Sequence, residues 1–273
     1  ADDVRIRVLR QLPRWTGDVD AAVLEILAGD IISEDPVLRE AAAGCLHLMV
    51  SPGSDGLALQ ILGDGHPGVR QAALRALQQR FPEFRDIAMR WVNDNQGNPR
   101  AQQTLIEFLQ QAELPNAACE SIAGRKVDEA SRLHDALAGL EQAITRDGET
   151  TALVLLGHAL RERLEQTIQL ALLALAPLYE PGIIGIIRAG FSSGDTRHIA
   201  NAIEALGNLD NRHIAERLHA ILQDNIGMQH AERASIFSSL ENVLDWCLTH
   251  PDAWLRNCAS YVRDHTAMEK AGA

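Results

Sequence analysis

The chain has 273 residues, enough to bury a continuous core, and its 25 basic and 37 acidic residues give a formal net charge of -12. Such an acidic balance repels a phosphate backbone, so no nucleic-acid partner is expected. Aromatic residues make up only 4% of the chain, whereas Ala, Leu and Ile are abundant, which favours helix over sheet. The composition therefore predicts an all-α protein.

The longest apolar run, residues 170–176, stops at Pro177 and is far shorter than the roughly 20 residues that cross a bilayer. We therefore do not expect this piece of chain to span a membrane, and a membrane-bound parent protein stays open. No signal-peptide pattern opens the chain, which does not begin with Met, so we expect an excised fragment or a processed chain.

The cysteines show no C-x-x-C spacing, and free buried thiols are the simplest interpretation of Cys45, Cys119, Cys247 and Cys258. Free thiols persist in a reducing compartment, which predicts a cytoplasmic location. No metal site and no cofactor are expected.

A short pattern recurs in the first hundred residues: a helix-capping residue, then Pro, then Arg. It reads Asp35-Pro36-Val37-Leu38-Arg39, His66-Pro67-Gly68-Val69-Arg70 and Asn98-Pro99-Arg100, with arginine spacings of 31 (39 to 70) and 30 (70 to 100). Asp or Asn can accept hydrogen bonds from the free amides of a first helical turn, and Pro at the first helical position sacrifices no hydrogen bond. A constant period near 30 predicts helical repeats, and each copy predicts the start of a first helix.

The pattern returns downstream as Asp195-Thr196-Arg197 and as Pro251-Asp252-Ala253-Trp254-Leu255-Arg256, and Asp3-Val4-Arg5 precedes Arg39 by about one period. We interpret these copies as repeat starts. The residues expected to have a structural role in the repeats are Asp35, Pro36, Arg39, Pro67, Arg70, Asp195, Arg197, Trp254 and Arg256.

We expect the second helix of a repeat pair to follow after a short break, at residues 19–27, 57–62 and 84–92. Between residues 114 and 180 the period near 30 is no longer clear, and longer helices are predicted at 127–144 and 151–176. Short helices return at 182–189, 196–206 and 212–222. We therefore predict three parts, residues 1–113, 114–180 and 181–273, in one continuous α-solenoid, because pairs of short helices cannot close a core without stacking on the next pair.

These motifs resemble the HEAT repeat superfamily, in particular the short units of phycobilisome-lyase-like repeat proteins. The resemblance covers most of the chain and implies a right-handed α-solenoid of stacked helix pairs. A narrower resemblance, carried by Leu156-Gly157-His158-Ala159-Leu160, residues 172–179 and 202–209, and the segment 254–259, is to the soluble HEAT region of bacterial carriers related to ATP/ADP translocases and major-facilitator transporters. It implies a cytoplasmic, transporter-associated domain that acts as a regulatory or protein-binding scaffold.

Solenoids bind protein or peptide segments on a concave face formed by their second helices. Arg85, Arg90 and Trp91 lie on one predicted second helix, and Trp and Arg are frequent in binding hot spots, so we expect them in the binding face. The competing interpretation places Trp91 in the core.

The residue pattern gives little support for an enzymatic function, and no catalytic residue is assigned. HEAT-like hydroxylases rely on His-Glu pairs, and no His here is followed directly by Glu. A lyase of the chromophore class stays open as the alternative function, because it has no local signature. His250-Pro251-Asp252 matches the tripeptide of J-domain co-chaperones, but the basic preceding helix is missing, so a helix cap is favoured. The run Arg161-Glu162-Arg163-Leu164-Glu165 predicts a solvated helix face.

Overall fold

The computed structural model describes residues 2–14, 19–49, 55–80, 83–148, 150–193, 195–224, 236–237 and 239–272. Across these ranges the chain forms fifteen α-helices and two 3₁₀ turns and contains no strand, which confirms the all-α expectation. The chain divides into two compact units, Ala1–Glu113 and Leu114–Ala273. The boundary falls where the short repeats are predicted to give way to longer helices.

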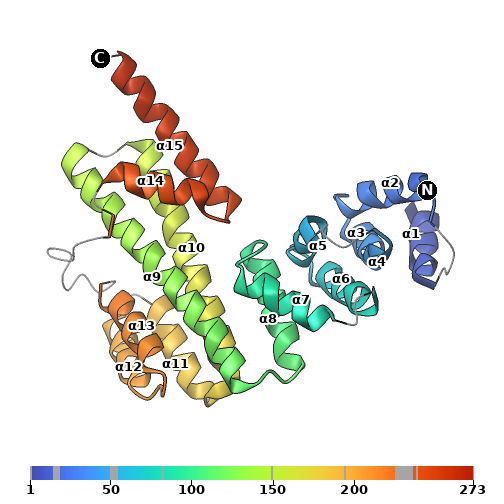
Figure 1. Ribbon diagram of the computed structural model, residues 1–273, viewed down its shortest axis with the longest axis horizontal. Coiled ribbons are helices and arrows are strands. Elements are labelled where there is room, and N and C mark those ends of the chain that lie inside the picture. Colours follow the sequence, from blue (N-terminus) through green and yellow to red (C-terminus); the bar gives the residue numbers. More distant parts are fainter. Residues whose placement is uncertain are drawn as a thin grey trace. The chain divides into compact units, whose positions relative to one another are not determined.

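Unit 1 consists of short helices that follow one another along the chain (Figure 1). They are α1 (Asp2–Gln11) with the 3₁₀ turn η1 (Leu12–Arg14), α2 (Ala21–Ile31), α3 (Pro36–Ala43), α4 (Leu46–Met49), α5 (Asp55–Leu62), α6 (Pro67–Arg80), α7 (Phe84–Asn93) and α8 (Pro99–Gln111). The three second helices predicted here correspond to α2, α5 and α7.

The repeat pattern starts helices as its residue types require. Asp35 is the N-cap of α3 and accepts a hydrogen bond from the Val37 amide, and Asn98 caps α8 in the same way at Ala101. Proline occupies the first turn of both helices, where its missing N–H leaves no carbonyl unpaired. Pro67 likewise opens α6. The helix starts predicted in unit 1 are therefore confirmed.

The arginine of the pattern folds back onto the turn before its own helix. Arg39 Nη1 donates to the backbone oxygens of Ser33 (2.7 Å) and Glu34 (2.9 Å), and Arg70 Nη1 donates to those of Asp64 (2.8 Å) and Gly65 (3.3 Å). In both cases the carbonyls lie six and five residues before the arginine. We call this arrangement the arginine clamp, and it fixes the loops that lead into α3 and α6.

A second contact repeats in unit 1, between an arginine and an aspartate 25 positions later. Arg5 pairs with Asp30 (2.5 Å) and Arg39 pairs with Asp64 (2.8 Å), so the whole contact recurs after 34 residues. Asp30 is buried and Asp64 is mostly buried. The guanidinium beside Asp64 holds the pKa of that carboxyl below its ordinary value, against the opposing effect of burial.

First helices in unit 1 pack on one another in sequence, α1 against α3 and α3 against α6. Each second helix packs against the first helix that follows it, α2 on α3, α5 on α6 and α7 on α8. The core between them is built mainly from Leu and Ala, including Leu27, Leu46, Ala73 and Leu77. Small side chains at these contacts let the helices approach closely, as the composition predicts.

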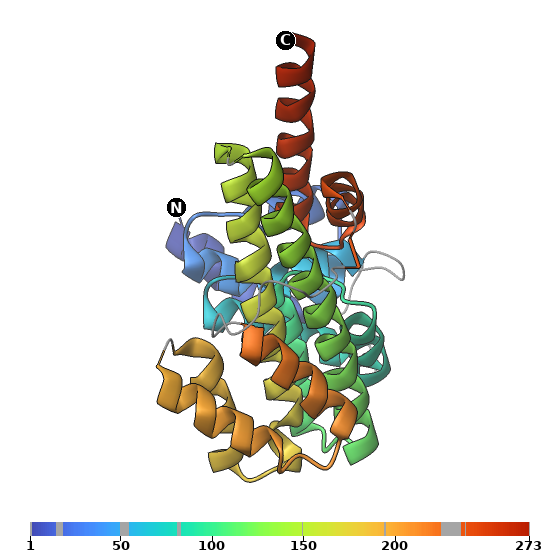
Figure 2. The ribbon, with the colours of Figure 1, turned by 90° about the vertical axis from the view of Figure 1, so that its left-hand side faces the viewer.

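Unit 2 is organised around two long helices that run side by side in both views (Figures 1 and 2). They are α9 (Asn116–Asp147) and α10 (Thr151–Leu175), and α9 ends at Gly148, whose φ of 96° few other residues adopt. The remaining elements are the 3₁₀ turn η2 (Ala176–Leu178), α11 (Pro181–Ser192), α12 (Thr196–Leu206), α13 (Arg212–Asp224), α14 (Leu240–Thr249) and α15 (Ala253–Gly272). Both long helices predicted between 114 and 180 are present, but α9 begins at Asn116 and not at the predicted residue 127.

The shorter helices of unit 2 form two groups against this pair. In the first, α11 packs on α10 and on α12, α12 packs on α13, and α13 packs on α9. In the second, α14 contacts α9 while α15 contacts α10 and α14. The C-terminal part of α15 extends past the ends of α9 and α10 (Figure 2). Residues 114–273 are thus one unit, and no boundary separates the part predicted to end at 180.

Candidate functional site

Helix α7 carries the residues that the sequence assigns to binding. Its buried side is formed by Phe84, Ala88, Trp91 and Val92, which recur at helical spacing. Arg85 and Arg90 are exposed, and a separation of five residues places them about 140° apart around the helix axis, on the two borders of the exposed side. Asp86 is exposed between them.

Trp91 belongs to the core and not to this exposed side. Its side chain is 2% exposed, its ring meets Phe84 edge-on at 6.1 Å between centroids, and its Nε1 donates to Asp55 Oδ2 at 2.8 Å. Trp91 therefore joins α7 to the start of α5. A partner cannot reach this indole on the folded protein, so the burial supports the competing interpretation of Trp91 as a core residue, and Arg85 and Arg90 are left as the candidates for contact.

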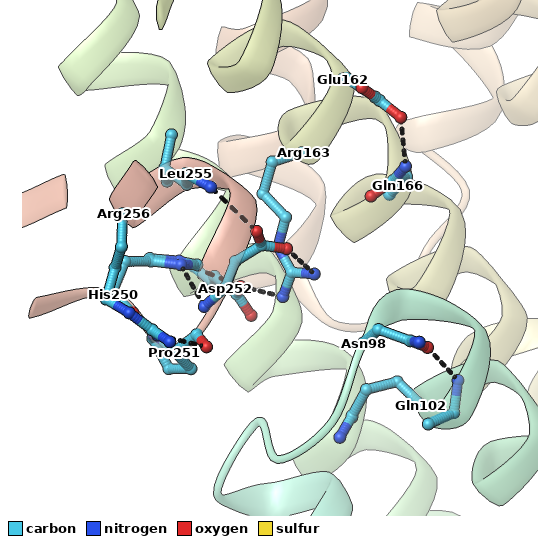
Figure 3. Close-up of polar contacts among 12 residues, drawn as sticks. Asn98, Gln102, Glu162, Arg163, Gln166, His250, Pro251, Asp252, Leu255 and Arg256 are labelled. Carbon is cyan, nitrogen blue, oxygen red and sulfur yellow. Dashed lines mark hydrogen bonds and ion pairs between the residues drawn. The ribbon is translucent and has the colours of Figure 1, made fainter. Parts of the chain in front are cut away.

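A second group of polar residues lies inside unit 2, where α9, α10 and the α14–α15 connection meet (Figure 3). Arg163 on α10 is 4% exposed and donates to Glu129 Oε1 on α9 at 2.8 Å and to Asp252 Oδ2 at 3.4 Å. His250 Nε2 lies 3.6 Å from the same Glu129 oxygen, and Lys126 Nζ lies 3.9 Å from Glu129 Oε2. We call these five residues the buried ion network.

The His250-Pro251-Asp252 tripeptide forms the start of α15. Asp252 Oδ1 accepts from the Leu255 amide (3.0 Å), and the Asp252 amide donates to His250 Nδ1 (3.1 Å). Arg256 Nη1 donates to the oxygens of His250 and Pro251, both at 2.7 Å, which is a third arginine clamp with the same offsets (Figure 3). The helix-cap interpretation is therefore confirmed, and the two polar side chains of the tripeptide face inward.

Burial and neighbouring charges act in opposite directions on Glu129. Burial raises its pKa, but the His250 hydrogen bond and the charges of Arg163 and Lys126 lower it more, so the pKa falls from 4.5 to about 2. Burial lowers the pKa of Lys126 to about 8, against the attraction of Glu129. The two cations Arg163 and Lys126 face the two anions Glu129 and Asp252. The network is suited to hold α14 and α15 against α9 and α10.

The sequence interpretation of residues 161–165 as a solvated face is wrong for Arg163. Arg161, Glu162 and Glu165 are exposed, whereas Arg163 points between the helices. Sequence reasoning also missed Lys126 and Glu129. Their positions carried a usable signal, because both fall on the buried stripe of α9 between Ile122 and Leu133 at spacings of four, three and four.

The network predicts a pH dependence of stability. Because the folded pKa of Glu129 lies below its ordinary 4.5, Glu129 stabilises the fold above pH 4.5 and loses this contribution as the pH falls toward 2. The free-energy difference between the wild type and Glu129→Gln, measured by urea unfolding, should therefore shrink across this window. For Glu141→Gln, at an exposed ion pair on the same helix, we expect a small difference at every pH. Equal behaviour of the two variants would contradict the assignment.

The downstream copies of the repeat pattern differ in the contacts that they form. Asp195 caps α12 by accepting from the Arg197 amide (2.8 Å), as predicted. Arg197 is exposed, and within the described ranges its guanidinium has no hydrogen bond, so this copy lacks the clamp. Trp254 is 54% exposed, and Tyr261 on the same helix is 43% exposed.

All four cysteines are free and buried, as predicted. Burial raises the pKa of Cys45 and that of Cys247 to about 12, so both thiols stay protonated and poorly nucleophilic. His213 lies 3.2 Å from Asp128 on an exposed surface. Among the residues that the structure describes, no three His, Cys, Asp or Glu side chains gather as metal ligands would, and no helix is both long and apolar enough to cross a membrane.

No model of a known protein family matches this chain, and comparison with curated proteins finds no relative.

Proposed function

We propose that this chain is a right-handed α-solenoid of HEAT-like repeats that serves as a scaffold for a protein or peptide segment. The observation that carries the proposal is the arginine clamp, which recurs with the same six- and five-residue offsets at Arg39, Arg70 and Arg256. A contact repeated with the period of the sequence indicates one supersecondary unit used several times. Stacked units of this kind bury a continuous core and expose an extended surface.

The binding surface in this proposal includes the exposed side of α7, bordered by Arg85 and Arg90. The clamp arginines are occupied by backbone carbonyls, and Arg39 also pairs with Asp64, whereas Arg85 and Arg90 have no ion pair among the described residues. Arginine forms bidentate hydrogen bonds with carboxylates, so the partner segment is expected to carry acidic side chains. Trp91 contributes only by fixing the helix from inside.

The wider setting follows from the resemblance of residues 156–160, 172–179, 202–209 and 254–259 to the soluble part of bacterial carriers. On that basis we propose that the chain works as a cytoplasmic domain associated with a membrane transporter. The supporting features are its free buried thiols and the helical repeats themselves. The partner segment would then belong to the carrier or to a protein that regulates it.

The experiment is quantitative affinity capture from a lysate of the source organism, with the retained proteins measured by mass spectrometry. The wild-type chain is compared with the Arg85→Glu/Arg90→Glu double variant. We expect one or a few proteins to be retained by the wild type and lost by the double variant, because charge reversal at both borders turns attraction into repulsion. Retention of a carrier component would support the transporter setting.

The matched control is Arg75→Glu, an exposed arginine on the first helix α6 of the same unit. It makes the same kind of charge change away from α7 and should retain the same proteins as the wild type. If Arg75→Glu and the double variant lose the same proteins, net charge and not the α7 surface controls capture. If the double variant retains everything that the wild type does, the proposed surface is wrong.

A further inference from the structure

Helix α1 presents an apolar ridge to the outside of unit 1. Val4 and Val8 are 66% and 58% exposed, and a spacing of four places them one turn apart on the same side of the helix. Leu9, on the other side of α1, is buried, and its carbonyl oxygen accepts from Cys45 Sγ at 3.3 Å. The helix is therefore docked by one side, and the two valines lie on its open side.

A basic ridge runs beside the two valines. Arg7 and Arg10, three residues apart, are both exposed, and no ion pair to either is found in the described chain. Arg7 follows Val4 by three residues and therefore lies next to the apolar ridge. The other arginine of this helix, Arg5, is already paired with Asp30. The open side of α1 thus combines apolar and positively charged groups in a chain whose net charge is -12.

No described acid of unit 1 forms an ion pair with Arg7 or Arg10. Asp3 is exposed one turn before Arg7, but the two side chains form no ion pair in the described part of the chain. Asp20 and Asp35 are held by the first turns of α2 and α3, where they cap backbone amides. Arg7 and Arg10 are therefore exposed and not ion-paired among the described residues, and a partner can contact them.

We propose that the open side of α1 binds a partner helix that carries an apolar stripe flanked by acidic residues. Val4 and Val8 pack against the apolar stripe, and Arg7 and Arg10 pair with the acidic flank. An anionic membrane offers the same charge, but a membrane is an extended surface that also meets the rest of an acidic chain and is repelled by it. A single helix touches only the α1 face, and this favours the helix as occupant.

This surface is independent of the α7 surface, because it uses different residues on a different helix. Loss of capture by the Arg85→Glu/Arg90→Glu variant says nothing about α1, and the failure of one proposal leaves the other standing. If both are correct, a scaffold of this kind holds two segments or two parts of one partner.

The experiment uses the full chain and a labelled amphipathic peptide with leucine at helical spacing and glutamate on both flanks. Its twin carries lysine in place of every glutamate. By fluorescence anisotropy the wild type should bind the glutamate peptide more tightly than the lysine peptide, and added salt should weaken binding. Val8→Asp should weaken binding about tenfold or more, and Arg7→Glu/Arg10→Glu should reverse the preference between the peptides.

Two variants act as matched controls: Val37→Asp, at a 44% exposed valine on α3, and Arg75→Glu on α6. Both should bind the glutamate peptide as the wild type does. Circular dichroism measures whether each variant keeps its helix content. If Val8→Asp unfolds, the Arg7→Glu/Arg10→Glu variant still tests the proposal.

Three results would overturn the proposal. The first is no binding of the glutamate peptide, or equal binding by Val8→Asp and wild type. The second is tight binding to phosphatidylserine vesicles that Arg7→Glu/Arg10→Glu abolishes while the peptide does not bind, which would assign the face to a membrane. The third is a Val8-dependent dimer in sedimentation, which would assign the face to a second copy of the chain.

Discussion

Replacing Arg163 by Met should lower the free energy of unfolding of unit 2 by about 3–5 kcal/mol, the cost of breaking a buried ion pair from one side. Arg163 is 4% exposed and is shared by Glu129 and Asp252, which lie on different elements. Without the guanidinium, Glu129 has, among the described residues, the more distant Lys126 amine and His250 imidazole beside it, and the desolvation of both carboxylates is no longer offset. Urea unfolding followed by circular dichroism measures the loss.

The control for this prediction is Arg161→Met on the same helix. Arg161 pairs with Glu141 at 2.9 Å, a distance close to that of the Arg163–Glu129 pair, but both partners are about half exposed. Solvent screens such a pair, so we expect a loss of about 0–1 kcal/mol. Similar losses for the two variants would mean that burial does not distinguish these contacts, and the role assigned to the buried ion network would be wrong.

The second large effect is expected at Gly190, where α11 crosses α12. A Cβ added at this position would lie 2.2 Å from Ala202 Cβ and 3.2 Å from the backbone oxygen of His198, and neither neighbour is a flexible side chain. Gly190→Ala must therefore push the helices apart, and we expect a destabilisation of about 1–3 kcal/mol despite the better helix propensity of Ala.

Gly185 provides a control with the opposite sign. It lies on the same helix, it is exposed, and a Cβ there would meet nothing within 4 Å. Gly185→Ala should stabilise the chain by about 0.5–1 kcal/mol through helix propensity alone. The thermal midpoints of the two variants should move in opposite directions. If both rise, the contact between α11 and α12 is looser than the structure indicates.

Local chemistry explains why most helix starts could be predicted from sequence. A capping side chain and a proline act within one helical turn, so Asp35-Pro36 and Asn98-Pro99 specify α3 and α8 without help from the rest of the fold. Apolar spacing likewise predicted the long helices α9 and α10. The pairing of Arg39 with Asp64 was not predicted, because it depends on how successive helices pack.

Whether a single polar or aromatic residue is buried or exposed was harder to predict, because this also depends on how successive helices pack. Arg163 lies in a run of charges that looks solvated, yet one residue of that run faces α9. Trp91 and Trp254 have the same chemistry, but α7 buries the first and α15 exposes the second. Helical spacing gives the side of a helix on which a residue lies, whereas the neighbour that covers that side is set by tertiary structure.

The central claim is that the clamp arginines maintain the fold while the exposed arginines of α7 bind a partner. The most direct test measures the thermal midpoint and the captured protein for Arg39→Ala and for Arg85→Glu/Arg90→Glu, with Arg197→Ala as the copy that lacks a clamp. We predict that Arg39→Ala lowers the thermal midpoint but retains the partner while folded. The double variant should keep the midpoint and lose the partner. Arg197→Ala should change neither the midpoint nor the captured protein. An unchanged midpoint with lost capture for Arg39→Ala would contradict the claim.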